Sequence, residues 1–575
     1  MRWLVLGILN LLTLLRLLPG LPFRVFSAKR KPLQYVRFTL KGDPPWRRFR
    51  KRSLFARRPE PGEVTSLYEL SKQLELLSED RRIEGVILDV EGLELSSAKR
   101  KALTDAIDRF RGKGKKVIAH AVSVGNIEYE LLCAADTIAL APAGRVDLVG
   151  FAAEATAIAE GLEKLGIRAE FIRRGEYKTA PELFTHKRLS DVQRQTLEMF
   201  LDERYGELLS ILTSRRKLTD EQARAKIDKG PYSAKRAFAE GLADVLVARA
   251  ELPVWLQTGK VPERPLSDEH EEKVPRIGTF ARWARLRAFP LGAFRKFRRR
   301  PQLALVPVTG MITGGEGGRA PVGPEVAGQE GVLRALKSAA EDDASAVLLY
   351  ISSPGGSAVA SEIILEQVQR LAAKKPVIAW CDRVAASGGY MAALGAKEIW
   401  SSPGAVIGSI GVFAGKFDAS ELLQKVGIHR ETLRRGANSA IFSGTRGFTE
   451  QERAAMEADI EETYQAFLEH VARSRKRTRE EIHARGEGRV FSAERALAEG
   501  LVDKVGSFEE ACAHALSLGL GKVVPEFDVV LHSASPANRF NLLSLLTLAQ
   551  TAQVYALEWP LLAIDGSQGS ENFRD

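Results

Sequence analysis

The chain contains two copies of one sequence pattern, and this repeat constrains the fold more than any other feature. KLGIRAEFIRRG at 164–175 corresponds to KVGIHRETLRRG at 425–436, and SAKRAFAEGLAD at 233–244 corresponds to SAERALAEGLVD at 492–503. Both pairs lie about 260 residues apart, as expected of a tandem duplication. The fold of one copy therefore predicts the fold of the other.

Each copy alternates short apolar runs with longer amphipathic runs. Such alternation predicts an α/β fold with a mainly parallel sheet and helices on its faces. In the second copy we expect, in order, a strand at 303–308, a helix at 332–340, a strand at 347–351, a helix at 361–373 and a strand at 377–381. A long helix is expected at 450–476, with its counterpart in the first copy at 190–216.

A chain of 575 residues is too long for a single core. We expect six segments: an apolar membrane anchor at 1–26, a basic linker at 27–59, a first α/β repeat at 60–256, a basic amphipathic linker at 257–301, a second α/β repeat at 302–534 and an apolar C-terminal tail at 535–575.

The ends of the chain and its linker suggest contact with lipid. The apolar run Trp3–Leu15 reaches the length of a bilayer span only if Arg16 is tolerated, so an interfacial helix is the alternative to a spanning anchor. The segments 46–58 and 276–300 interleave aromatic and basic residues, which fits anionic lipid better than nucleic acid; a solvated linker is the simpler alternative. We therefore expect membrane lipid, and no nucleic acid, as a partner.

No motif for cofactor chemistry is present. The three cysteines, Cys133, Cys381 and Cys512, are too scattered for a metal cluster or a disulfide framework. The sequence also lacks a P-loop, a Rossmann glycine fingerprint and an HExxH pattern. We expect neither a metal nor an organic cofactor.

The stretch VIAWCDRVAASGGY at 377–390 is the strongest candidate for a reactive site. An apolar strand leads into Ser387 and Gly388, and an Ala-rich helix follows. A serine at such a turn exposes its hydroxyl, and the helix N-terminus supplies positive potential for an oxyanion. A serine that only caps the helix is the alternative.

A second apolar strand ends in Ser352-Ser353-Pro354-Gly355-Gly356. Its glycines offer backbone N–H groups, and ligands of open α/β sheets collect at the carboxyl ends of strands. We expect Gly355 or Gly356, together with Gly388, to bind an oxyanion near Ser387.

The two copies differ at the positions of the candidate site residues. Opposite Ser387 the first copy has Asn126, and opposite the glycine loop it has Glu91-Gly92-Leu93. Beyond the shared RRG, however, the first copy has Lys178 where the second has Ser439. One copy keeps a candidate nucleophile and the other keeps a candidate base.

Four stretches resemble the signal peptide peptidases of the protease IV type, in their long, duplicated form. They are ISSPGGS at 351–357, AASGGY at 385–390, GSIGV at 408–412 and GEYKTAPE at 175–182. The resemblance implies a fold similar to those of the Clp proteolytic subunit and the crotonases, and a membrane-bound serine protease with a Ser/Lys dyad that digests cleaved signal peptides. It also implies a homotetramer at the bacterial inner membrane with its catalytic body on the periplasmic side. The positive-inside rule instead places the basic residues 24–58 in the cytoplasm, unless the first segment lies in the interface.

In the implied mechanism Ser387 attacks the peptide carbonyl and Lys178 takes its proton. A lysine base must be neutral, so its pKa must fall below the ordinary value of about 10.4. The neighbours Tyr177, Thr179 and Ala180 make desolvation feasible. An apolar peptide would bind as an added strand along a sheet edge. Two other functions remain open, a crotonase-like acyl-CoA enzyme and a non-catalytic membrane scaffold.

Overall fold

The computed structural model describes residues 2–20, 33–48, 62–262, 274–285, 300–319 and 325–533. The chain divides into two compact units. Unit 1 joins Met1–Phe151 to Glu203–Arg299, and unit 2 joins Ala152–Asp202 to Arg300–Asp565. The stretch 152–202 of the first copy thus folds with the second copy. The expected C-terminal tail, 535–575, lies outside the described residues, as do most of the two basic segments.

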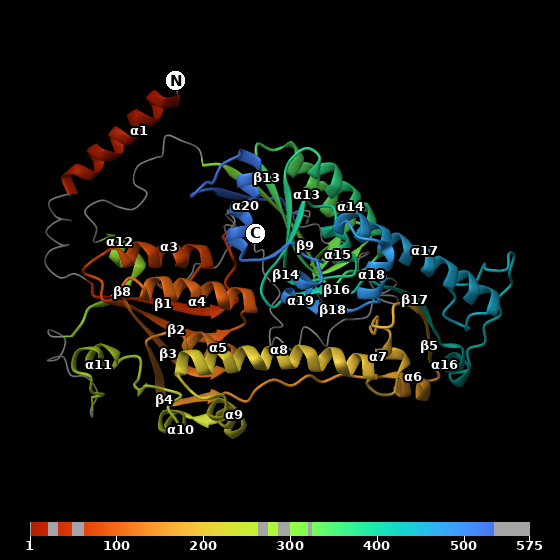
Figure 1. The fold of residues 1–575 in the computed structure, drawn as a ribbon, viewed down its shortest axis with the longest axis horizontal. Helices are drawn as coiled ribbons and strands as arrows, with labels where there is room; N and C mark the ends of the chain where they lie inside the picture. Colours follow the sequence, from red (N-terminus) through yellow and green to blue (C-terminus); the bar gives the residue numbers. More distant parts are fainter. Residues whose placement is uncertain are drawn as a thin grey trace. The chain divides into compact units, whose positions relative to one another are not determined.

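Unit 1 is built on a sheet with the strand order β6-β4-β3-β2-β1-β8, and β7 pairs with β4. Figure 1 labels β1 to β4 and β8 of this sheet. Strands β1 to β4 run parallel. The strands are β1 (Tyr35–Gly42), β2 (Gly85–Leu93), β3 (Lys116–Gly125), β4 (Thr137–Asp147), β6 (Tyr232–Ser233), β7 (Val245–Leu246) and β8 (Ile277–Thr279). The helices are α1 (Arg2–Leu17), α3 (Leu67–Ser78), α4 (Ser97–Arg111), α5 (Asn126–Leu132), α9 (Asp220–Lys229), α10 (Ala234–Ala239), α11 (Leu252–Thr258) and α12 (Phe280–Arg285). A short 3-10 helix, η1 (Leu18–Gly20), follows α1.

Two strands of unit 1 come from stretches that we expected to be linkers. Strand β1 lies within 27–59 and pairs with β2, and β8 lies within 257–301 and pairs with β1. The linker interpretation is wrong for these residues. In β1 the buried residues Val36 and Phe38 flank Arg37, whose guanidinium pairs with Asp89, so a charge in the strand obscured its apolar character.

Unit 2 is built on a larger sheet with the order β18-β16-β14-β13-β9-β20, and β15 lies between β14 and β19. Its strands are β9 (Gln302–Thr309), β10 (Met311–Thr313), β11 (Gly318–Arg319), β12 (Glu325–Gly328), β13 (Ala346–Ser353), β14 (Val377–Ala386), β15 (Glu398–Ser401), β16 (Val406–Gly408), β18 (Val490–Ser492), β19 (Lys504–Val505) and β20 (Asp528–Leu531). Its helices are α6 (Ala159–Leu165), α7 (Glu182–Thr185), α13 (Gln329–Glu341), α14 (Ala358–Ala372), α15 (Gly388–Ala393), α16 (Ser420–Lys425), α17 (Glu450–Arg475), α18 (Arg479–Arg485), α19 (Ala493–Ala498) and α20 (Phe508–Leu520). Helix α8 (Asp191–Arg216) runs from unit 2 into unit 1.

The strands and helices predicted for the second copy are confirmed, because β9, α13, β13, α14 and β14 overlap them in the expected order. The three central strands are parallel, and residues of both faces are fully buried along β13. Burial on both faces explains why these strands are continuous apolar runs. The two long helices, α8 and α17, are also confirmed.

The duplication is visible in matched hydrogen bonds. Tyr129 donates its hydroxyl to the carbonyl of Leu242 at 2.8 Å, and Tyr390 donates to that of Leu501 at 2.7 Å. The aspartates that end the repeated EGLAD and EGLVD motifs, Asp244 and Asp503, each accept a strand N–H at 2.7 Å. The same side chains thus hold the same elements together in each copy.

One strand pair joins the copies within unit 2. Strand β5 (Arg168–Arg174) comes from the first copy and pairs antiparallel with β17 (Val412–Asp418) of the second (Figure 1). Ile172 of β5 is buried against Met456 and Ile460 of α17. This ribbon carries the residues just before Lys178 into unit 2.

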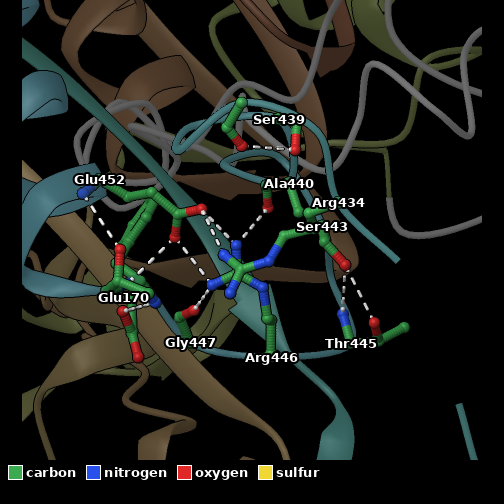
Figure 2. Close-up of polar contacts among 12 residues, drawn as sticks. Glu170, Arg434, Ser439, Ala440, Ser443, Thr445, Arg446, Gly447 and Glu452 are labelled. Carbon is green, nitrogen blue, oxygen red and sulfur yellow. Dashed lines mark hydrogen bonds and ion pairs between the residues drawn. The ribbon is translucent and has the colours of Figure 1, made fainter. Parts of the chain in front are cut away.

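A charge cluster around the buried Glu452 fixes the ribbon to the start of α17, as Figure 2 shows. Arg446 donates to the carboxylate of Glu452 at 2.7 Å, and this carboxylate also accepts the N–H of Thr449, the N-cap of α17. Glu170 of β5 accepts the N–H of Phe448 at 3.0 Å. The pKa of Glu452 is lowered to about 2, mainly by the hydrogen bond from Arg446.

Among the described residues no helix is long and apolar enough to cross a bilayer. The predicted spanning anchor is therefore not confirmed. Helix α1 exposes a row of large apolar side chains, namely Ile8, Leu11, Leu12 and Leu15.

We predict that Glu452→Gln lowers the melting temperature at pH 7, because removing a hydrogen-bonded charge from a partly buried pair costs about 1 to 3 kcal/mol. The folded pKa lies below the ordinary 4.5, so the ionised carboxylate stabilises the protein above pH 4.5. That contribution is lost as the pH falls from 4.5 towards 2, and the gap between variant and wild type should close there. Thermal melts across this range measure it.

Glu366→Gln is the matched control, because Glu366 forms an exposed pair with Arg370 on one helix. It should change stability by less than about 0.5 kcal/mol. A Glu452→Gln melt equal to that of this control at pH 7 would contradict the prediction.

Candidate active site

Ser387 lies at the turn between β14 and α15, as predicted. Its φ of 52° and ψ of −121° are unusual for a residue with a side chain. The turn is held by a hydrogen bond of 2.8 Å from the N–H of Ser387 to the carbonyl of Gly408. The serine is partly exposed, whereas Ala386 and Gly388 on either side of it are buried. Strained backbone of this kind concentrates at functional sites.

The glycine loop after β13 packs directly on this turn. Gly355 has a φ of +103°, and a Cβ atom there would lie 2.8 Å from the Cβ of Ser387 and 2.7 Å from the nitrogen of Gly388. Only glycine fits so close an approach. A Cβ atom on Gly388 would lie 3.3 Å from the nitrogen of Gly356, so the backbones of both segments meet beside Ser387.

The hydrogen bonds of this loop distinguish its N–H groups. Gly355 donates its N–H to Ser353 Oγ at 3.2 Å. The carbonyl of Gly355 accepts the N–H of Ile312, and the carbonyl of Ile312 accepts the N–H of Ser357. The N–H of Gly356 therefore takes no part in this β-bridge. The N–H of Gly388 is in the first turn of α15, where amides have no partner within the helix. The N–H groups of Gly356 and Gly388 are therefore better suited than that of Gly355 to bind an oxyanion beside Ser387.

Lys178 follows β5 and is buried, with 3% of its surface exposed. Its Nζ donates to Ser409 Oγ at 2.7 Å and lies 3.4 Å from the Ser409 carbonyl oxygen. The ring of Phe413 is centred 6.0 Å from the same nitrogen. Burial disfavours the charged form of this amine, whereas the two oxygen acceptors and the ring of Phe413 favour it.

Ser387 and Lys178 form hydrogen bonds to two consecutive residues of unit 2, Gly408 and Ser409. Ser387 is bonded to the carbonyl of Gly408, and Lys178 to the side chain of Ser409. Ser409 itself has a φ of 52°. The structure therefore brings the candidate nucleophile of the second copy and the candidate base of the first copy to one short segment.

Sequence analysis missed Ser409. It lies in the GSIGV motif at 408–412, which we used only to establish the resemblance. A buried lysine needs acceptors for its N–H groups. A serine in this motif is only a weak signal of that role, because its contact with Lys178 spans 231 residues of sequence.

The loop of Lys178 is held by a second set of contacts, which centres on the buried Glu182. Arg173 donates to the carbonyl of Lys178 at 3.2 Å and to the carboxylate of Glu182 at 2.7 Å. Ser190 donates its hydroxyl to the other oxygen of Glu182 at 2.6 Å. Glu182 is 3% exposed and ends the GEYKTAPE motif, so this motif carries both the lysine and its support.

The positions opposite the site residues serve local structure instead. Asn126, opposite Ser387, accepts the N–H groups of Val149 and Gly150 and donates to the carbonyl of Gly150. Ser439, opposite Lys178, is exposed and donates to the carbonyl of Gly436 in its own loop (Figure 2).

Two family profiles match the sequence. Peptidase family S49 matches residues 109–260 and 369–519, once in each copy, and Clp protease matches residues 326–405. These matches, with a serine on a strained turn beside a glycine loop, define the protein as a serine protease with a Clp-like α/β fold.

Curated relatives agree with this assignment. The chloroplastic serine protease SPPA of Arabidopsis thaliana is 28% identical over 84% of this chain and 71% of its own length. Protease 4 of Salmonella typhi is 29% identical over 81% of this chain and 74% of its own length. A putative protease of Synechocystis is 33% identical over 40% of this chain and 79% of its own length. The chain belongs to peptidase family S49, and the resemblance to the protease IV type is confirmed.

Proposed function

We propose that the protein is a membrane-associated endopeptidase that uses Ser387 as nucleophile and Lys178 as general base. The observation that carries the proposal is the buried Lys178 Nζ, held by Ser409 next to the residue that fixes the turn of Ser387. A serine hydroxyl needs a neighbouring base to become a nucleophile. No histidine serves here in our mechanism.

In this mechanism Ser387 Oγ forms a bond to the carbonyl carbon of the peptide, and its proton passes to Lys178. The N–H groups of Gly356 and Gly388 bind the oxyanion, and Gly355 allows their close approach. The C–N bond then breaks, and Lys178 returns the proton to the leaving amine. Lys178 then takes a proton from water, whose oxygen attacks the carbonyl carbon of the acyl-enzyme ester. The ester C–O bond breaks, and Lys178 returns the proton to Ser387 Oγ. None of these steps needs a metal or cofactor.

We further propose apolar peptides, such as cleaved signal peptides, as substrates. An extended peptide added as a strand would present its carbonyl to Ser387 and alternate side chains to the protein. Membership in a peptidase family favours this activity over the acyl-CoA alternative. The contacts of Lys178 argue against the scaffold alternative, because a decayed site does not need a buried lysine.

We predict that Ser387→Ala abolishes hydrolysis of an apolar peptide and that Lys178→Ala lowers kcat by about 100- to 10,000-fold. Lys178→Arg should fail equally, because guanidinium stays protonated. The wild-type rate should rise with pH, with an apparent pKa below that of free lysine. A pH–rate profile checks this, and near-normal turnover by Lys178→Arg would show that the base lies elsewhere.

We also propose that the protein lies on the bacterial inner membrane, with its catalytic body on the periplasmic side and α1 in the lipid interface. The exposed side chains of Ile8, Leu11, Leu12 and Leu15 support this placement.

Leu11→Ser combined with Leu12→Ser should weaken binding to vesicles of anionic lipid, measured by flotation of the full-length protein. The control double variant Val359→Ser with Val523→Ser removes apolar side chains of unit 2 that are at least as exposed, and it should leave flotation unchanged. Equal flotation of the α1 variant and wild type would contradict the interfacial role of α1.

We finally propose that copies of the chain assemble through a reciprocal strand pair, as a homotetramer. By the repeat, 151–157 corresponds to β17 and 429–435 to β5. Both segments are largely exposed, and neither forms a helix or strand in the described structure. A second copy supplies the missing partner, with 151–157 of one chain pairing with 429–435 of the next.

Thr432→Pro or Leu433→Pro should dissociate the assembly, measured by sedimentation velocity in detergent. Neighbouring N–H groups of a strand point in opposite directions, so at least one of these prolines removes a ladder hydrogen bond. Leu433→Ser is the control that keeps the N–H. Unchanged sedimentation of both proline variants would exclude this interface.

A further inference from the structure

A three-residue segment, Glu487–Arg489, lies between the lysine loop and the serine turn. It connects α18 to β18, and β18 pairs with β16, the strand that ends at Gly408. Nothing in its sequence, EGR, marks it as part of a catalytic site. Its contacts reach both halves of the proposed dyad.

On one side the segment holds the lysine loop. The carbonyl of Glu487 accepts the N–H of Tyr177 at 2.7 Å. The guanidinium of Arg489 lies 4.1 Å from the centre of the Tyr177 ring. A Cβ atom on Gly488 would lie 2.7 Å from the Cα and 2.8 Å from the Cβ of Lys178. The backbone of Gly488 is thus in direct contact with that of the lysine.

On the other side the segment holds the acceptor of the lysine. The carbonyl of Arg489 accepts the N–H of Ser409 at 2.6 Å, and the N–H of Gly488 donates to the carbonyl of Ile410 at 2.8 Å. The residue before the lysine, Tyr177, and the serine partner of the lysine, Ser409, are therefore both hydrogen-bonded to this segment. The spacing between Lys178 Nζ and Ser409 Oγ depends on the thickness of this segment.

The backbone of the segment is strained. Glu487 has a φ of 49° and Gly488 a φ of +82°, so two consecutive residues are left-handed. Non-glycine residues keep such angles only where the surrounding contacts impose them. Ser387 and Ser409, with φ of 52° each, are the other strained residues of this region.

The other copy gives an internal comparison. The repeated SAKRAFAEGLAD and SAERALAEGLVD place Ser233 opposite Ser492, and therefore Lys229 opposite Gly488. The first copy has no nucleophile, and there the position carries a long, exposed side chain. Glycine is present in the copy where this position contacts the backbone of Lys178, the proposed base.

From these contacts we infer that Glu487–Arg489 is a positioning element for the dyad, with Gly488 as the spacer that sets the place of Lys178 against Ser409. The inference rests on the proposed Ser/Lys mechanism. None of the three side chains touches the reacting atoms, so they act through the lysine loop and the Ser409 turn.

The test is Gly488→Ala in the full-length protein. The added methyl group displaces the lysine loop, and misplacement by about 1 Å is expected to lower kcat about 100-fold with little change in KM. Lys178 moves towards water, so the rising limb of the pH–rate profile should shift by at least ~0.5 pH unit to higher pH. A purely structural role for Gly488 does not predict that shift.

Gly521→Ala is the matched control. Gly521 has a φ of +67°, and a Cβ atom there meets nothing within 4 Å. It carries the same backbone strain without the contact, and its kcat and pH profile should equal those of wild type. Wild-type kcat and pH profile in a Gly488→Ala protein that melts normally would overturn the inference.

Arg489→Ala decides the matter if Gly488→Ala fails to fold. It removes the contact with Tyr177 but keeps the backbone, and a several-fold loss of kcat with a pH shift of the same sign is expected. An unchanged pH profile in that variant would overturn the inference.

The Lys178→Ala background separates this inference from the proposed function. Adding Gly488→Ala to Lys178→Ala should cause no further loss, because the effect acts through the lysine. If Lys178→Ala itself is active, the dyad is wrong. If only Lys178→Ala is impaired and Gly488→Ala is not, the dyad stands and the positioning role is wrong.

Discussion

The pairing of β5 with β17 is the interaction on which the proposed active site depends. Seven residue pairs, from Arg174 opposite Val412 to Arg168 opposite Asp418, bind a strand of the first copy to one of the second. The ribbon packs on α17 through Ile172 and is fixed there by the charge cluster around Glu452. Lys178 comes four residues after the end of β5, so the pairing of β5 with β17 places the lysine in unit 2.

The ribbon explains how the two copies can share the proposed site. In that proposal each copy supplies one member of the dyad, and the residue opposite it in the other copy has a local role: Asn126 binds the turn at 149–150, and Ser439 hydrogen-bonds within its own loop. Ser387 and Lys178 are hydrogen-bonded to the consecutive residues Gly408 and Ser409. A buried amine needs compensation, which Ser409 supplies, and the strained backbone at Ser387, Ser409 and Glu487 is held by hydrogen bonds from neighbouring segments.

Much of this could be predicted from sequence. Continuous apolar runs predicted β9, β13 and β14, because parallel strands are buried on both faces, and the turn at Ser387 followed from the strand and helix around it. The repeat singled out Lys178 by its difference from Ser439. What could not be predicted depends on contacts distant in sequence. These are the pairing of Arg37 in β1 with Asp89 of the neighbouring strand, the folding of 152–202 with unit 2, and the contact of Ser409 with Lys178.

The most direct test of this account is a cross-link across the ribbon. Ile172 and Ala414 are register partners, and Cα atoms of opposed antiparallel residues lie within disulfide reach. Ile172→Cys with Ala414→Cys should form a disulfide within one chain of the full-length protein, detected as a linked peptide, with reaction of Ser387 with a fluorophosphonate preserved. Ile172→Cys with Phe417→Cys, about 10 Å along the strand, should not link. No link in the first pair, or a link only between chains, would contradict the central claim that the lysine of the first copy folds into the serine unit of its own chain.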